Sequence, residues 1–267
     1  MSDAPKVLAE PLPEDVPGEE HSHWLGATVV FVVLIALWEW ACRGLGVTPN
    51  LLPSPSAVGM ELVGNFATLL RHTWVTAIEL VVGFAIATVI GIALAILVDR
   101  SKMLSSVIRP YIIALQAMPK VALAPFFVIW FGFGITSKVA MAAIITFFPI
   151  FVSAVAGFAA MSPRMIDLMT VLRATPSQIM WKAKVPAALP YIFAGLEIGI
   201  LLALTGAIVG EFVSATAGLG YLIAIYNSQL HTAAAFAALV MLVLLGVISY
   251  GMVLAVKRRV VFWLGKM

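Results

Sequence analysis

Long apolar runs alternate with short polar connections along most of the chain. About 20 apolar residues suffice to cross the hydrocarbon layer of a bilayer. Six runs reach about that length, at residues 24–46, 74–98, 111–133, 139–160, 191–213 and 233–256. The pattern therefore predicts an all-α polytopic membrane protein with about six transmembrane helices.

Three segments depart from this pattern. Residues 1–23 are acidic and contain four prolines, so we expect a disordered tail ahead of a transmembrane domain over 24–267. Residues 47–72 begin with a proline-rich turn, in which Ser54 or Ser56 can cap the helix that follows. The segment continues with apolar positions at helical spacing among polar ones, which predicts an amphipathic helix on the membrane surface. Residues 161–190 form the third segment.

This third segment, which we call the elbow, carries clustered charge and two helix starts. Ser162 can cap a first helix, with Pro163 at its first position. Thr175 can cap a second, with Gln178 three residues later at capping-box spacing. Pro186 and Pro190 are expected to end the unit, because proline lacks an amide donor. Short amphipathic helices need a surface to lie against, which suggests a soluble partner.

The third apolar run contains Pro119, Lys120 and Pro125, so a straight helix is not expected there. Proline is tolerated in a membrane segment where neighbours or water satisfy the freed carbonyl groups. This places the run in the protein interior or beside a cavity.

Composition supports the membrane assignment. Hydrophobic residues make up 62% of the 267 residues and charged residues only 11%, and the mean hydropathy is +1.07. A soluble domain carries about 25% charged residues, so this class is excluded. The single Cys42 excludes an internal disulfide. Nothing in the small net charge of +3 points to a nucleic-acid partner.

Basic residues are unevenly divided between the two sets of connections. One face collects Lys6, Arg100, Lys102, Arg109, Arg164, Arg173, Lys182, Lys184, Lys257, Arg258, Arg259 and Lys266. The other face collects Arg43, Arg71 and Lys138. Because lysine and arginine accumulate in cytoplasmic loops, we expect both termini and the elbow in the cytoplasm.

Five ionisable residues fall within or at the ends of the apolar runs. Glu39 and Glu211 are near run ends, where we expect interfacial solvation, whereas Glu79, Lys120 and Glu197 lie deeper. A charge near the bilayer centre costs at least about 2.5–3.5 kcal/mol, so such residues normally line a cavity or pair with one another.

Two hypotheses therefore remain open for Lys120. In the first, Gln116, Lys120, Glu79 and Glu197 belong to a translocation path, in which Lys120 attracts an anionic group of a solute and Gln116 supplies hydrogen bonds. In the second, Lys120 forms an ion pair with Glu79 or Glu197 that only organises the helix bundle.

The chain from about residue 51 onward resembles the transmembrane subunit of type I ABC importers. The resemblance lies in the branch of the nitrate, taurine, alkanesulfonate and thiamine-precursor permeases. The residues that carry it are LPSPSAV (52–58), HTWVTAIELVVGF (72–84), RPYIIALQAMPKVALAPFFVIWFGFG (109–134), KVPAALPYIFAGL (184–196) and GEFVSATAGLGYLI (210–223). The elbow matches the family's coupling loop, which docks in a cleft of the ATP-hydrolysing subunit.

The resemblance implies that part of the elbow couples this chain to the ATPase. The residues expected to do so are Arg164, Asp167, Arg173, Ala174, Thr175, Gln178, Ile179, Met180 and Lys182. The family's Glu-Ala-Ala triplet is here Asp167, Leu168 and Met169, and Arg173 stands where glycine is usual.

The resemblance also implies a set of partners and a location. They are a second copy of the chain, two ATP-binding subunits, a periplasmic substrate-binding protein and the lipids of the bacterial inner membrane. The chain has no G-x-x-x-x-G-K-[ST] phosphate loop, so ATP and Mg²⁺ are expected on the partner ATPase and no cofactor on this chain. The expected solute is small and anionic or heteroaromatic, of the sulfonate, nitrate, vitamin-precursor or aromatic-acid type.

Two other functional classes were weighed. An ATP-independent secondary transporter or channel often shows inverted repeats and paired broken helices, whereas this chain has one broken run and no convincing repeat. A membrane-embedded metalloenzyme would need clustered ligands, and two of the four histidines lie in the tail. We expect no catalytic residue and no metal site.

Overall fold

The computed structural model describes residues 19–264, and every secondary-structure element in that range is helical. The elements are α1 (Glu19–Gly44), α2 (Pro55–Gly64), α3 (Phe66–Arg100), α4 (Lys102–Ala117), η1 (Lys120–Leu123), α5 (Ala124–Phe131), α6 (Ile135–Ala159), α7 (Pro163–Val171), α8 (Pro176–Ile179), η2 (Met180–Lys184), α9 (Val185–Ser214), α10 (Leu219–Ser228), α11 (Thr232–Val260) and η3 (Phe262–Leu264). The all-α prediction is confirmed.

Within residues 19–264, four helical runs are long and apolar enough to cross a membrane by length and composition. They are α3, α6, the run Pro176–Ser214 that ends with α9, and α11. The expected first span corresponds to α1, whose apolar side chains from Val29 to Leu37 are largely exposed. Most of the expected tail lies outside the described residues, but residues 19–23 belong to α1.

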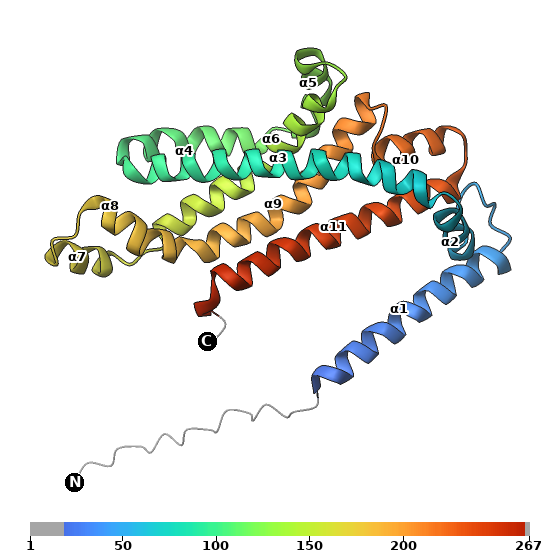
Figure 1. Ribbon diagram of the computed structural model, residues 1–267, viewed down its shortest axis with the longest axis horizontal. Helices are drawn as coiled ribbons and strands as arrows, with labels where there is room; N and C mark the ends of the chain where they lie inside the picture. The colour runs from blue at the N-terminus through green and yellow to red at the C-terminus, as the bar shows by residue number, and fades with distance from the viewer. Residues whose placement is uncertain (1–18, 265–267) are drawn as a thin grey trace, which may run out of the picture.

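The expected third span is broken, as its prolines predicted. Helix α4 ends at Ala117, the chain turns at Pro119, and the short helices η1 and α5 follow. Gly132 then adopts a φ of +77°, a left-handed conformation that suits glycine, and ends α5. Figure 1 shows α5 projecting from the long helices.

Helix α6 forms the centre of the bundle and packs against α9 on one side and α3 on the other. Small residues allow the backbones to approach closely, as is usual between membrane helices. A Cβ atom on Gly206 of α9 would lie 2.7 Å from the Cα of Ala142 in α6. A Cβ atom on Gly83 of α3 would lie 2.6 Å from the Cβ of the same alanine. These contacts leave no room for a larger side chain.

The expected amphipathic segment 47–72 is divided between two helices. Ser54 caps α2 by accepting a hydrogen bond from the amide of Ala57 at 3.3 Å. Helix α3 already begins at Phe66, so residues 66–72 form the first turns of a long helix rather than a surface helix. Leu69 is consequently buried against Val58 of α2 and Leu219 of α10.

The elbow and the end of α11 lie at one end of the bundle, and α2 and α10 lie at the other (Figure 1). We call these the elbow end and the α10 end. The prediction that Pro186 and Pro190 stop the elbow is wrong, because helical structure is continuous from Pro176 to Ser214. Pro186 lies in the first turn of α9, where its missing amide is tolerated, and follows the π-helical turn η2.

Candidate functional site

The two helix starts of the elbow are where the sequence placed them. Ser162 occupies the cap position of α7, although its side chain makes no capping hydrogen bond. At α8, the Thr175 hydroxyl accepts a hydrogen bond from the Gln178 amide at 3.3 Å, and the Gln178 side chain accepts one from the Thr175 amide at 2.8 Å. The predicted capping box is confirmed.

The turn between α7 and α8 places a bulky residue in a left-handed conformation. Arg173 has a φ of +56°. The amide of Ala174 donates to the Met169 carbonyl, and that of Arg173 to the Thr170 carbonyl, each at 2.9 Å. This pair of bonds is the Schellman arrangement, which normally has glycine at the left-handed position. The resemblance described above implies glycine at this position, and glycine would adopt this conformation without the steric cost of a Cβ atom.

Helix α7 has no buried residue, and apolar side chains on it and directly after its end are exposed. Leu168 is 52% exposed, Val171 80% and Leu172 68%. An apolar patch of this kind on a protruding helix is typical of a protein–protein contact. The charged residues of the elbow that were expected to couple to the ATPase are also exposed, namely Arg164, Asp167, Arg173 and Lys182.

The remaining expected coupling residues are less uniform in burial. Thr175 and Gln178 are exposed, and Ala174 and Ile179 are partly buried. Met180 is only 5% exposed and packs in the core of the bundle. We call η2, which joins the elbow to α9, the root of the elbow. The Met180 side chain is thus part of this root and not of the outer surface of the elbow.

At the α10 end, Glu211 lies in a buried polar cluster that joins three helices. Its carboxylate accepts hydrogen bonds from the Thr76 hydroxyl at 2.7 Å and the Gly220 amide at 2.5 Å. Glu79 lies beside it, and both glutamates are 2% exposed. Interfacial solvation of Glu211 was therefore a wrong expectation.

Two more residues of this cluster were assigned to the surface from sequence. Lys138 is 2% exposed, and its ammonium group donates to the carbonyls of Phe133, Gly134 and Ser214 at 2.5–3.1 Å. His72 is 6% exposed and accepts a hydrogen bond from the Gly218 amide at 3.0 Å. The cluster fixes the start of α10 to α3, and the end of α9 to α6.

A signal for part of this cluster was present in the sequence. His72, Thr76 and Glu79 are spaced by four and three residues, which places them on one face of a helix. A polar stripe inside an apolar run indicates an internal face. Lys138 gave no such signal, because it lies only four residues after Gly134, at the start of an apolar run.

Lys120 and Gln116 lie together in the broken third segment. The Lys120 ammonium group donates to the Gln116 backbone carbonyl at 3.2 Å and lies 4.9 Å from the centre of the Phe148 ring. Gln116 is exposed and Lys120 is partly buried.

Within the described residues, neither ion pair that the second hypothesis required is present. Glu197 of α9 pairs instead with Lys257 of α11 at 2.8 Å, and Glu79 lies in the cluster around Glu211. The four expected path residues therefore occupy three separate places. Among the described residues, no group of three or more histidine, cysteine or acidic side chains could hold a metal ion.

Four long apolar helices in the described part of the chain define a multi-pass membrane protein. A model of the binding-protein-dependent transport system inner membrane component matches residues 87–262. The chain belongs to this family, the permease subunits of ABC importers. Such subunits are not enzymes, and ATP hydrolysis belongs to a separate subunit.

Individual relatives agree with this assignment. The formylaminopyrimidine transport permease ThiX of Halalkalibacterium halodurans is 34% identical over 90% of this chain and 96% of its own. The riboflavin permease RibX of Chloroflexus aurantiacus is 34% identical over 90% of each chain. In the crystal structure of the MetNI methionine ABC transporter, one chain matches with a TM-score of 0.65 at 21% identity. The match covers 74% of this chain and 98% of that one, and it shows a shared fold.

Proposed function

We propose that this chain lines the translocation path of an importer for a small heteroaromatic or anionic solute and couples that path to ATP hydrolysis through the elbow. The observation that carries the proposal is the exposed apolar face of α7. Leu168, Val171 and Leu172 lie at the end of the bundle on a helix with no buried residue. A protruding helix of this composition needs a partner to cover it.

The proposed partner is an ATP-binding subunit in the cytoplasm. The elbow lies at the same end of the bundle as the basic terminus of α11 (Figure 1), which carries Lys257, Arg258 and Arg259 in its last turn. The positive-inside rule favours this end as the cytoplasmic one. A periplasmic binding protein would then deliver the solute at the α10 end.

The proposed path runs beside Lys120 and Gln116. Polar side chains at membrane depth need water or protein around them rather than lipid. A second copy of the chain facing this segment would supply the other wall, so we propose a homodimer. Lys120 would attract an anionic group of the solute, and Phe126 and Trp130 of α5 offer exposed aromatic surface nearby in the chain. The names of ThiX and RibX favour a heteroaromatic solute.

Co-purification of the ATP-binding subunit with the permease tests the coupling role of the elbow directly. Leu168→Asp and Val171→Asp should prevent a tagged permease from retaining the ATP-binding subunit during purification. Met60→Asp is a matched control, because Met60 is an apolar residue 71% exposed on α2 at the opposite end. Full retention by both elbow variants, or uptake by the permease without any ATPase, would refute the proposal.

Uptake into proteoliposomes tests the path. Riboflavin, formylaminopyrimidine and taurine are supplied in turn with the binding protein. Lys120→Met should lower uptake of an anionic solute by about tenfold or more, since a hydrogen bond to a charged group contributes about 1.5–3 kcal/mol. Arg258→Met, at the exposed end of α11, is the control. Normal uptake by Lys120→Met would eliminate the path role of this lysine.

A further inference from the structure

The root of the elbow is joined to α3 by an ion pair. The Lys184 ammonium group, at the end of η2, lies 2.7 and 2.9 Å from the two carboxylate oxygens of Asp99 in the last turn of α3. The two side chains are only 19% and 14% exposed. A partly buried pair is screened less than a surface pair, so it can hold the two elements in register.

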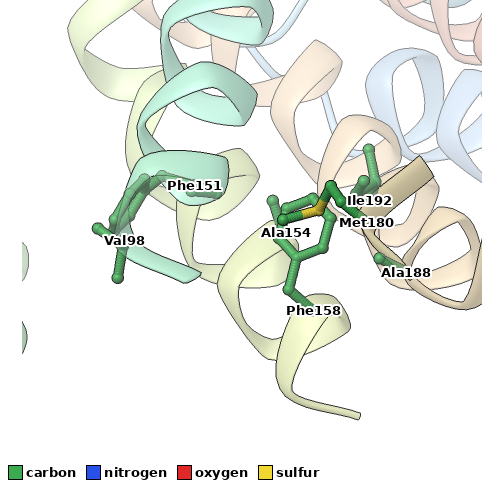
Figure 2. Packing of buried hydrophobic residues seen from close by; sticks show 8 residues of the cluster. Val98, Phe151, Ala154, Phe158, Met180, Ala188 and Ile192 are labelled. Carbon is green, nitrogen blue, oxygen red and sulfur yellow. The ribbon is translucent and has the colours of Figure 1, made fainter. Parts of the chain in front are cut away.

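An apolar contact accompanies this pair. Met180, four residues before Lys184, is inserted into a cluster formed by the ends of α3, α6 and α9, where it lies near Ala154 and Ile192 (Figure 2). Val98, next to Asp99, belongs to the same cluster. The root of the elbow is therefore fixed to the bundle by one ion pair and one buried side chain. Helix α7, by contrast, has no buried residue.

The helices on either side of the elbow are also locked together. A Cβ atom on Gly157, near the end of α6, would lie 2.9 Å from the Cβ of Tyr191 and 3.0 Å from the Ala188 carbonyl in α9. Such close backbone packing leaves α6 and α9 little freedom to slide. Gly91 of α3 approaches α6 less closely, since a Cβ atom there would lie 3.3 Å from the Cγ2 atom of Ile150 and 3.5 Å from the Phe151 amide nitrogen. At this end α3 meets α6 through side chains, with Ala95 and Val98 in the same apolar cluster as Phe151.

We propose that Asp99 and Lys184 are positioning residues that transmit a displacement of the elbow to α3. When an ATPase moves the elbow, α6 and α9 follow through their backbone packing, and α3 follows through the ion pair. This inference rests on the proposed docking of an ATPase at the elbow. Movement of α3 in response to the ATPase would depend on the pair of Asp99 and Lys184, whereas movement of the elbow itself would not.

Hydrogen exchange of the purified permease–ATPase complex tests the inference, with ATP and vanadate as the probe. The parent complex should show an ATP-dependent change in exchange both in α7 and at residues 92–100 of α3. In Lys184→Met and in Asp99→Asn, the ATP-dependent change in exchange should persist in α7. The change in α3 should fall by at least about twofold, which is the smallest effect expected when a residue of a coupling network is replaced. Exchanging the two residues, as Asp99→Lys with Lys184→Asp, should restore it.

Lys257→Met is the matched control, because it breaks an ion pair of similar length between α11 and α9 that does not involve the elbow. It should leave the response of α3 unchanged. An undiminished α3 response in the two single variants would overturn the inference, as would an exchanged pair that folds and stays unresponsive. If Lys184→Met does not fold, the results for Asp99→Asn and for the exchanged pair decide whether the ion pair transmits the displacement to α3. Absence of any ATP response in α7 of the parent complex would instead refute the proposed docking.

Discussion

Replacing Arg173 by glycine should stabilise the elbow, although the substitution removes a charged side chain. Arg173 is exposed and adopts a φ of +56° in the turn that ends α7. For a residue with a Cβ atom, this left-handed conformation costs about 1–2 kcal/mol. Glycine avoids that cost but loses about 0.5–1 kcal/mol more backbone entropy on folding. The net gain expected for Arg173→Gly is therefore about 0.5–1 kcal/mol.

Hydrogen exchange at the end of α7 is the suitable assay, because the gain is local and need not change global unfolding. The amides of Arg173 and Ala174 close the turn by donating to Thr170 and Met169. At about 1.4 kcal/mol per factor of ten, Arg173→Gly should slow exchange in this turn by about two- to fivefold. The position 173 amide reports in every variant, since glycine keeps its N–H.

A graded series separates backbone strain from loss of the charge. Asparagine tolerates the left-handed region better than most residues, so Arg173→Asn should slow exchange by an intermediate amount. Arg173→Ala removes the guanidinium group and keeps the Cβ atom, so it should slow exchange little or not at all. Equal protection in the alanine and glycine variants would show that the side chain, and not the backbone, destabilises the turn. The same three variants, tested for ATPase retention, show whether docking needs the charge.

Three further perturbations address the two ends of the bundle. Glu211→Ala should lower stability by about 1–3 kcal/mol, because it removes the buried acceptor of the Thr76 hydroxyl and the Gly220 amide, and a lower melting temperature in detergent would show this. Gly218→Ala should also lower the melting temperature, because Gly218 has a φ of +117° and an added Cβ atom would overlap the Glu211 carboxylate; a melting curve like that of the parent would contradict this. Thr175→Ala should weaken the elbow by about 1 kcal/mol by removing a cap, and Thr175→Ser should not, as measured by hydrogen exchange in α8.

The sequence predicted the elbow well because its structure is determined locally. A capping box depends on residues three positions apart, and a proline at a helix start acts on its own turn. Thr175 and Gln178 therefore form the expected bonds. The same argument failed for Pro186, because an effect on one turn does not decide whether a helix continues on both sides of it. The π-helical turn before Pro186 cannot be read from spacing alone.

The polar cluster at the α10 end could not be predicted in the same way, because its contacts join residues far apart in the chain. Glu211 bonds to Thr76, and Lys138 bonds to the Ser214 carbonyl. Proximity to the end of an apolar run suggested solvation for Glu211 and a loop position for Lys138. Both inferences treat the run end as the protein surface. In a bundle whose connections fold back over the helix ends, that assumption does not hold.

These two ends impose a direction on any motion of the bundle. At the α10 end, buried hydrogen bonds tie α3 to α9, α9 to α10, and α6 to the last residue of α9. At the elbow end, α7 has no buried residue, and the root is held by Met180 and one ion pair. Under the proposed function, an ATPase that moves the elbow displaces α6 and α9, because both helices are continuous with it in the chain. We expect the bundle to respond by rotation of packed helices rather than by local rearrangement, since packed cores convert small shifts at one end into a two-state change at the other.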